Sequence, residues 1–180
     1  MPRKETAMFY DLLKSRRSIR KFQDRELEKE KINTILKSAL LAPSSRAIRP
    51  WEFIAVTDRA LLKELSGCKE FGSQFLGGAP LGIVVLADAT SCDVWVEDAS
   101  IASIIIQLSA QSLDLSSCWI QVRERFHSGE VKAEDYIKGV LGIPEKYSVE
   151  CILAVGYAGE EKKAYSEKEL LYSKVHVNRF

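Results

Sequence analysis

Residues 81–115, LGIVVLADATSCDVWVEDASIASIIIQLSAQSLDL, join a short apolar run to a much longer apolar segment. Residues 81–87 are bounded by Pro80 and Asp88, which is typical of a buried strand. Residues 94–115 are long enough to raise the question of a membrane helix. A charge inside hydrocarbon is costly, so the polar side chains in this segment favour a helix buried in a protein core. These side chains are Glu97, Asp98, Gln107, Gln111 and Asp114.

Outward from this pair, the sequence predicts further helices and strands. Residues 28–41 carry apolar side chains at helical spacing, and Pro43 ends this helix because the residue before a proline disfavours helical geometry. Thr6 is placed to cap an earlier helix that runs to about Lys14. Shorter helices are predicted at residues 59–65 and 135–141, and strands at residues 51–56, 118–122 and 151–155.

Composition narrows the class of protein. The chain has 180 residues, 46% of them hydrophobic, which is enough for one domain over residues 1–180 with a substantial core. A formal net charge of +1 argues against nucleic-acid binding. Residues 1–22 lack the apolar stretch of a secretory signal, so we expect a cytoplasmic protein that is not bound to a membrane. The four cysteines have no C-x-x-C spacing and only two histidines are present, so we expect reduced thiols and no metal site.

The basic run RRSIRKF, residues 16–22, directly follows the first predicted helix. In an extended segment alternate side chains point the same way, so Arg16, Ser18 and Arg20 would line one surface while Ile19 packs inward. Guanidinium groups bind phosphate oxygens in pairs, and each sheltered charge-assisted hydrogen bond contributes about 1.5–3 kcal/mol. The run is therefore either a phosphate site or a solvated basic turn.

A loop held between two prolines follows the second predicted helix, at residues 42–53, APSSRAIRPWEF. By itself it is either a rigid turn or a binding loop. It resembles the A-P-S-x-x-N-x-Q-P-W loop of the nitroreductase family, at that family's usual distance after an R-R-S-x-R segment. Residues 113–120, LDLSSCWI, are similar to the family's L-G-L-G-S-C-W-I turn, and residues 174–180, KVHVNRF, resemble its basic C-terminal tail. The resemblance thus spans nearly the whole chain.

The resemblance implies an α+β fold, with a central mixed, mostly antiparallel sheet flanked by helices. It implies an obligate homodimer with domain-swapped tails and two FMN sites, each built from both chains. NADH or NADPH would reduce the flavin at N5, and a small oxidised acceptor such as a nitroaromatic or a quinone would reoxidise it in a ping-pong cycle without a catalytic side chain. Reductive dehalogenation and flavin binding without turnover are the alternatives on this fold, and residues 126–136 are a candidate lid.

The resemblance also assigns positions to the cofactor site. Arg16 and Ser18 would hold the FMN phosphate, helped by Arg17 and by Arg179 from the tail. Arg20 would lie near flavin N1 and O2, where a fixed cation raises the flavin potential. Pro43, Ser44 and Ser45 would approach from the partner chain, beside Ala47 and Arg49, and the backbone of Ser117 and Cys118 would face the ring near N5.

Four positions depart from the family pattern. Ala47 stands where the loop usually has Asn, and Arg49 stands where it usually has Gln. Arg49 either favours anionic substrates or forms a salt bridge to Glu52. Asp114 and Ser116 replace glycines, and because a positive φ is cheap only for glycine, these replacements predict a turn of different shape.

Overall fold

The computed structural model describes residues 3–180 of the chain, with side chains from residue 8 onward. Its centre is a four-stranded sheet in which every pair of neighbouring strands is antiparallel. The strand order is β1 (Trp51–Val56), β2 (Leu81–Asp88), β6 (Tyr147–Gly156) and β3 (Ser116–Gln121). The prediction of an α+β fold built on a mostly antiparallel sheet is confirmed.

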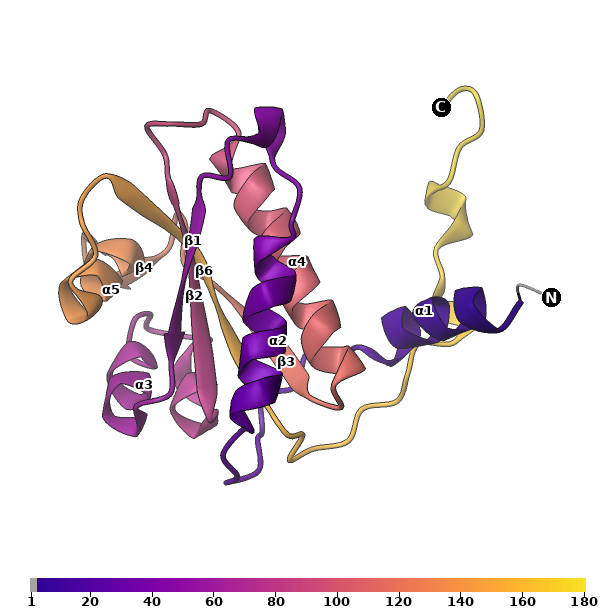
Figure 1. Ribbon diagram of the computed structural model, residues 1–180, viewed down its shortest axis with the longest axis horizontal. Helices are drawn as coiled ribbons and strands as arrows, with labels where there is room; N and C mark the ends of the chain where they lie inside the picture. The colour runs from indigo at the N-terminus through magenta and orange to yellow at the C-terminus, as the bar shows by residue number, and fades with distance from the viewer. Residues whose placement is uncertain (1–2) are drawn as a thin grey trace.

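Helices cover both faces of this sheet (Figure 1). Helices α2 (Lys29–Leu40) and α4 (Trp95–Ser112) pack on one face, and α3 (Arg59–Leu65) and α5 (Ala133–Leu141) pack on the other. Helix α1 (Arg3–Ser15) extends away from the sheet beside the C-terminal tail (Figure 1). The remaining elements are short: η1 (Ser45–Ala47), η2 (Gln74–Gly78), β4 (Phe126–Ser128), β5 (Val131–Lys132), η3 (Glu167–Glu169) and η4 (Tyr172–Lys174).

The two central strands bury both of their faces, which explains the unbroken apolar run in β2. Ile83 and Val85 pack toward α2 and α4, whereas Val84 and Leu86 pack toward α3 and α5. None of these four side chains is more than 2% exposed. A strand with helices on both faces has no polar side to present to water, so its sequence shows no alternation.

Helix α4 is a core helix, as its polar interruptions predicted. Ala99, Ala102, Ile106 and Ala110 are fully buried. The buried polar side chain of Gln107 donates a hydrogen bond to the Ser117 hydroxyl at 3.2 Å. No helix within residues 3–180 combines the length and the hydropathy needed to cross a membrane.

Several element boundaries differ from those predicted. Helix α1 begins at Arg3, so the prediction that Thr6 caps it is wrong; the unpaired N–H groups of its first turn lie upstream of Thr6. Strand β6 begins at Tyr147 rather than at residue 151, because its first residues pair with the end of β2. Strand β3 likewise begins at Ser116, inside the segment expected to be a turn.

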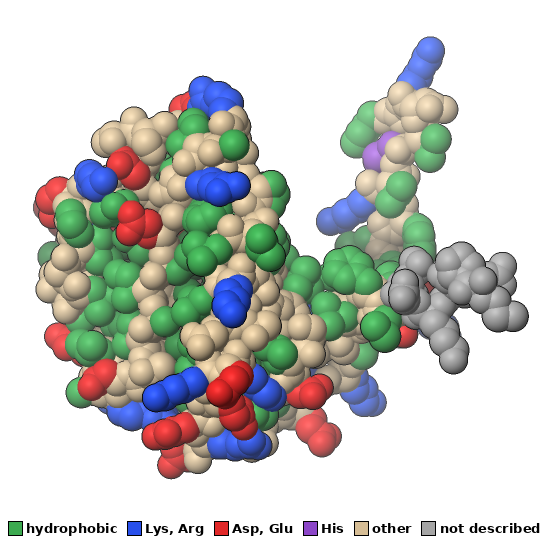
Figure 2. Space-filling view, viewed as in Figure 1, with side chains coloured by type: hydrophobic (Ala, Val, Ile, Leu, Met, Phe, Trp, Pro, Cys, Tyr) green, Lys and Arg blue, Asp and Glu red, His purple; other side chains and the backbone are tan. Residues whose placement is uncertain are grey.

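Apolar side chains remain exposed over α1, α2 and α4, where Figure 2 shows them as a discontinuous green surface. A groove of about 800 Å³ lies between these helices and is lined by Phe9, Leu12, Ile105 and Leu108, among others. The C-terminal tail is also apolar and exposed. Its large apolar side chains are Leu171, Tyr172, Val175, Val177 and Phe180.

The close approach at the end of β6 gives a test of packing. A methyl group added at Gly156 would lie 2.6 Å from Cδ of Pro80 and 2.9 Å from Cδ1 of Phe22, so Gly156→Ala should lower the free energy of unfolding by about 1–3 kcal/mol in urea. Gly139→Ala is the control, since it adds a methyl group to α5 with no atom within 4 Å apart from the backbone of its own helix and its chain neighbours, and it should raise stability by about 0.5–1 kcal/mol. Equal effects of the two substitutions would contradict this account.

Candidate functional site

The basic segment at residues 16–22 runs along the edge strand β3 and adds a short parallel contact to the sheet. Ser18 forms an isolated parallel bridge with Ser117, and the Ile19 N–H donates to the Ser117 carbonyl at 3.1 Å. The Ile19 side chain is only 4% exposed, so it packs inward as predicted. In extended backbone, Ser18 and Arg20 then point to the opposite side.

Arg16, Ser18 and Arg20 all act on the thiol of the buried Cys118 in strand β3. Burial raises the pKa of the Cys118 thiol, while Arg20, Ser18, Lys162 and Arg16 act in the opposite direction because they lie close to it. The structure therefore brings together three of the side chains predicted for a phosphate site. It adds Lys162, whose Nζ donates to the Ser18 carbonyl at 2.5 Å.

Lys69, from another part of the chain, is also influenced by the Cys118 thiol. Burial lowers the pKa of Lys69, an effect that Arg125 reinforces and that the Cys68 and Cys118 thiols oppose. The neighbouring Phe75 ring lies 5.8 Å from the Arg20 guanidinium. Sequence reasoning missed both Lys69 and Lys162, because each lies in a mixed run of charges that resembles a solvated surface.

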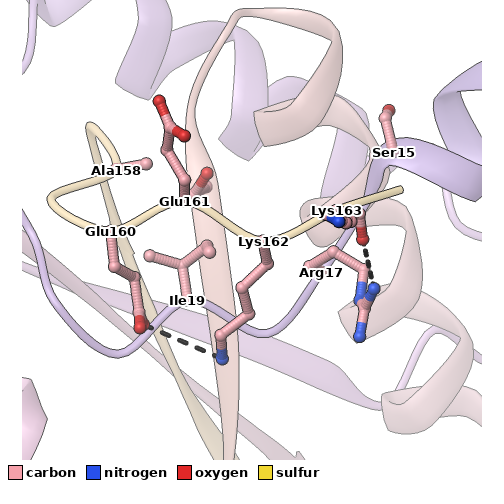
Figure 3. Close-up of a pocket in the computed structure, with 9 residues that line it drawn as sticks. Ser15, Arg17, Ile19, Ala158, Glu160, Glu161, Lys162 and Lys163 are labelled. Carbon is pink, nitrogen blue, oxygen red and sulfur yellow. Dashed lines mark hydrogen bonds and ion pairs between the residues drawn. The ribbon is translucent and has the colours of Figure 1, made fainter. Parts of the chain in front are cut away.

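Arg17 faces away from Arg16, Ser18 and Arg20, into a pocket that Lys162 also lines. Its guanidinium donates to the Lys163 carbonyl and lies 4.1 Å from the centre of the Tyr165 ring. It lines a pocket of about 460 Å³ between the basic segment and residues 158–163, which cross over it (Figure 3). Alternation in the extended segment explains this placement, since Arg17 shares the side of Ile19.

Glu160 fixes the backbone of the basic segment. Its carboxylate accepts the N–H of Arg20 at 2.6 Å and the N–H of Lys21 at 3.2 Å, and it pairs with Lys162 at 3.8 Å (Figure 3). The hydrogen bond from Arg20 is the main cause that lowers the pKa of Glu160. We call residues 158–165 the strap, because Glu160, Lys162 and the carbonyl of Lys163 tie them to the basic segment.

The loop at residues 43–50 holds an unusual backbone. Arg46, Ala47 and Arg49 have φ values of 51°, 55° and 53°, in the left-handed region that favours glycine. Residues held in this region cost about 1–3 kcal/mol each, and they cluster at functional sites where the surrounding structure imposes them.

Acidic side chains anchor this loop to the start of α4. Asp98 is only 3% exposed and accepts the N–H of Ser45 at 2.9 Å. The Cys92 thiol donates to the other oxygen of Asp98 at 3.5 Å. Asp93 forms an ion pair with Arg46. Together these contacts determine the direction in which the loop leaves the molecule.

The turn before β3 keeps a glycine-like backbone despite its sequence. Asp114 has a φ of 59°, the conformation that a glycine would adopt most easily. Aspartate tolerates it better than most residues. Ser116 lies in extended β3. Asp114 therefore takes left-handed geometry without being a glycine.

Within one chain, the remaining predicted positions lie apart from the basic cluster. Pro43, Ser44 and Ser45 lie near the start of α4, where Ser45 is bound by Asp98, whereas the basic segment pairs with Ser117 in β3. The end of the tail, which carries Arg179, projects away from the sheet (Figure 1). The backbone N–H of Arg179 donates to the Val177 carbonyl at 2.8 Å, a contact within the tail itself.

The arrangement defines an α+β protein with a cationic cluster on an edge strand and an exposed loop held in strained backbone. Comparison with known proteins identifies the family. The model of the nitroreductase family matches residues 13–68 and 67–157. This chain belongs to the nitroreductase family, as its loops indicated.

Individual relatives agree with this assignment. The solved structure of an FMN-dependent nitroreductase from Clostridium difficile R20291 is 55% identical, with a TM-score of 0.94 over 95% of this chain and 99% of that one. A protein from Archaeoglobus fulgidus, classed as NADH dehydrogenase/NAD(P)H nitroreductase, is 40% identical over 86% of this chain and 87% of its own length. An iodotyrosine deiodinase from Thermotoga neapolitana is more distant, at 24% identity over 96% of this chain and 99% of its own length.

The contacts of Glu160 predict a dependence of stability on pH. Because its pKa is lowered in the folded state from the usual 4.5, Glu160 stabilises the fold above that value and loses this contribution as the pH falls through the folded pKa. Glu160→Gln should therefore be less stable than the parent at pH 6, and the difference should shrink at pH 3. Urea unfolding at both pH values measures it.

Glu161→Gln is the matched control, because the neighbouring Glu161 is exposed and makes no ion pair with the other described side chains. It should shift stability little at either pH. A Glu160→Gln difference that is the same at pH 3 and pH 6 would contradict the role assigned to its carboxylate.

Proposed function

We propose that this chain is an FMN-dependent oxidoreductase that takes hydride from NADH or NADPH and passes it to a small oxidised acceptor, such as a nitroaromatic or a quinone. One observation carries the proposal: in a chain of the nitroreductase family, the basic segment pairs with the edge of β3 at Ser117, and the charges of Arg16, Arg20 and Lys162 act on the adjacent Cys118 thiol. Bound FMN would supply the two-electron chemistry, in a ping-pong order in which nucleotide and acceptor use the same flavin face in turn.

The donors in the cluster fit a phosphate. Arg16 provides positive charge, and the Ser18 hydroxyl provides a hydrogen-bond donor, on the side of the basic segment opposite the buried Ile19. Glu160 lies nearby and pairs with Lys162, so the net positive charge of the cluster comes from Arg16 and Arg20. These residues would hold the phosphate of FMN.

The other cations of the cluster would act on the ring system. Arg20 and Lys69 both lie near Cys118, and the Phe75 ring beside Arg20 provides an apolar wall. Positive charge at the pyrimidine side of the flavin stabilises the negative charge that two-electron reduction leaves there. We assign the backbone of Ser117 and Cys118 to the side near N5. No side chain need transfer a proton if water supplies it.

We propose that the site is completed by a second copy of the chain. The apolar groove between α1, α2 and α4 and the apolar tail are both exposed in one chain, and a homodimer with exchanged tails would remove both from water. In this arrangement Pro43, Ser44, Ser45, Ala47 and Arg49 approach the flavin of the partner, and Arg179 arrives with the tail.

We also propose that residues 1–180 form one domain, since β2 and β6 contribute to the apolar clusters on both faces of the sheet. A cytoplasmic location is consistent with the four cysteines, which are buried and unpaired in the structure.

The alternative of reductive dehalogenation receives no specific support from the candidate lid. In residues 126–136, His127 contacts the Gly67 carbonyl through Nδ1 at 2.8 Å and stacks on Tyr136 with 4.1 Å between ring centres. The Tyr136 hydroxyl donates to the Glu64 carbonyl at 3.3 Å. These contacts fasten the β4–β5 hairpin to the body of the fold.

The purified protein should carry a yellow chromophore that NADH or NADPH bleaches in the absence of air, and a nitroarene or a quinone should restore the colour. Absorbance near the flavin maximum, followed during both half-reactions, measures this. Protein that binds FMN but is reduced by neither nucleotide would support flavin binding without turnover and would refute the oxidoreductase proposal.

Arg16→Ala should weaken FMN binding by about 1.5–3 kcal/mol, or about tenfold or more, because it removes a charge-assisted contact to the phosphate. Fluorescence titration of the apoprotein with FMN measures the change, and circular dichroism checks that the fold is kept. Arg17→Ala is the matched comparison, since Arg17 faces the strap, and it should cost less affinity. Equal losses of FMN affinity from the two variants would overturn the assignment of Arg16, and not Arg17, to the phosphate.

A further inference from the structure

Arg49 is held firmly at its backbone while its side chain remains exposed. Its N–H donates to the Ser44 hydroxyl at 2.8 Å, its φ is 53°, and the following Pro50 restricts the chain further. Proline also excludes helical geometry from the residue before it. The Cα of Arg49 is therefore fixed in position, whereas its guanidinium is free to meet a ligand.

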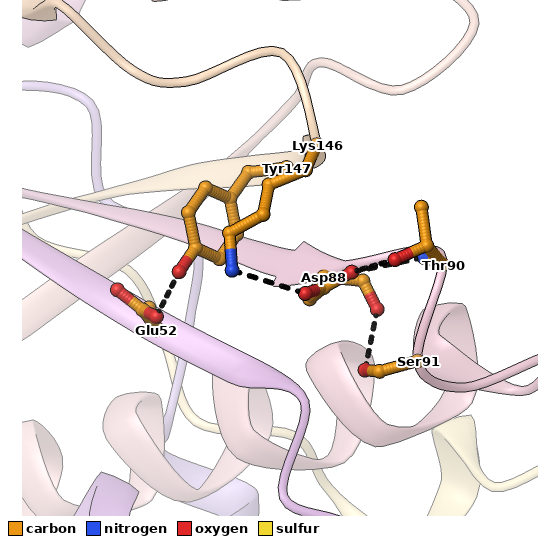
Figure 4. A network of polar contacts seen from close by, with 6 residues as sticks. All are labelled: Glu52, Asp88, Thr90, Ser91, Lys146 and Tyr147. Atoms are coloured by element: carbon orange, nitrogen blue, oxygen red, sulfur yellow. Dashed lines mark hydrogen bonds and ion pairs between the residues drawn. The ribbon is translucent and has the colours of Figure 1, made fainter.

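The charge of Arg49 is not neutralised within the described chain. The neighbouring Arg46 takes Asp93 as its partner. Glu52, the acidic residue nearest in sequence, accepts a hydrogen bond from the Tyr147 hydroxyl, in a network that also holds Asp88 and Lys146 (Figure 4). Among the side chains of residues 8–180, none forms an ion pair with Arg49, so the predicted alternative of a salt bridge to Glu52 is not observed.

The other polar groups of the loop are already engaged. The Ser44 hydroxyl accepts from the backbone of Arg49, and the Ser45 N–H is bound by Asp98. Ala47 offers only a methyl group. The guanidinium of Arg49 thus remains as the charged donor that this loop can present to a substrate.

We infer that Arg49 is a specificity-determining residue that selects acceptors carrying an anionic substituent, such as a carboxylate on an aromatic ring. The inference rests on the proposed function, in which this loop covers the flavin of the partner copy. The planar guanidinium fork matches a carboxylate with two parallel hydrogen bonds. A fixed backbone reduces the conformational entropy lost when that pair forms.

Matched ligands that differ only in charge test the inference. Benzoate and benzamide, titrated into the FMN-loaded protein, report binding through perturbation of the flavin spectrum, and 4-nitrobenzoate and 4-nitrobenzamide report kcat/KM. Arg49→Gln should weaken benzoate binding and lower kcat/KM for 4-nitrobenzoate by about tenfold or more, with less than about a twofold change for the two amides. Arg49→Lys, which keeps the charge, should retain part of the preference.

Arg59→Gln is the charge-matched control, because it removes one positive charge from the remote start of α3. It should leave unchanged the preference for benzoate over benzamide in binding and the preference for 4-nitrobenzoate over 4-nitrobenzamide in kcat/KM. Equal losses for the anionic and the neutral ligands would overturn the inference. A change confined to the KM of NADH or NADPH would overturn it too, since it would assign Arg49 to the nucleotide.

Failure of the proposed function would look different. In that case the parent protein itself would bind no FMN, reduce neither nitro compound or sediment as a monomer. A parent that is a flavin-loaded dimer and turns over both nitro compounds, but shows no loss of charge preference on Arg49→Gln, refutes only the role of Arg49.

Discussion

The pairing of the basic segment with the edge of β3 is the constraint on which the candidate site depends. The hydrogen bond from Ile19 to Ser117 fixes the register, and burial of the Ile19 side chain fixes which side faces the core. With that settled, Arg16, Ser18 and Arg20 share the outer side. A shift by one residue would bring Arg17 to the cluster and expose Ile19 to water, so the core of the protein determines which cations are available to a ligand.

Each of the two functional segments is held by a carboxylate that accepts backbone N–H groups. Glu160 binds the N–H groups of Arg20 and Lys21, and Asp98 binds the N–H of Ser45. Hydrogen bonds of this kind fix the main chain without occupying the side chains of the segment. The side chains are then free for a ligand, as the exposed guanidinium of Arg49 illustrates.

Much of the fold could be predicted from local patterns. The helix at 28–41 is predicted by the helical period of its apolar residues, and the segments at 81–87 and 94–115 are predicted by the length and limits of their nearly unbroken apolar runs. Boundaries were less accurate: β6 extends back to Tyr147 because its length is set by pairing with β2, a partner distant in sequence. Lys69 and Lys162 were missed for the same kind of reason, since nothing in their charged surroundings shows which strand they approach.

The sequence by itself determined the kinds of element, the apolar core and the concentration of positive charge in the RRSIRKF segment, because these depend on residues close together in the chain. Only the tertiary structure decided that Lys69 and Lys162 act with Arg16 and Arg20 in the environment of Cys118, and that Arg17 contacts the strap. It also decided that, in the 43–50 loop, Arg46 pairs with Asp93 whereas Arg49 has no acidic partner among the described side chains. These outcomes depend on distances between segments remote in sequence, which sheet pairing and burial set and local periodicity does not encode.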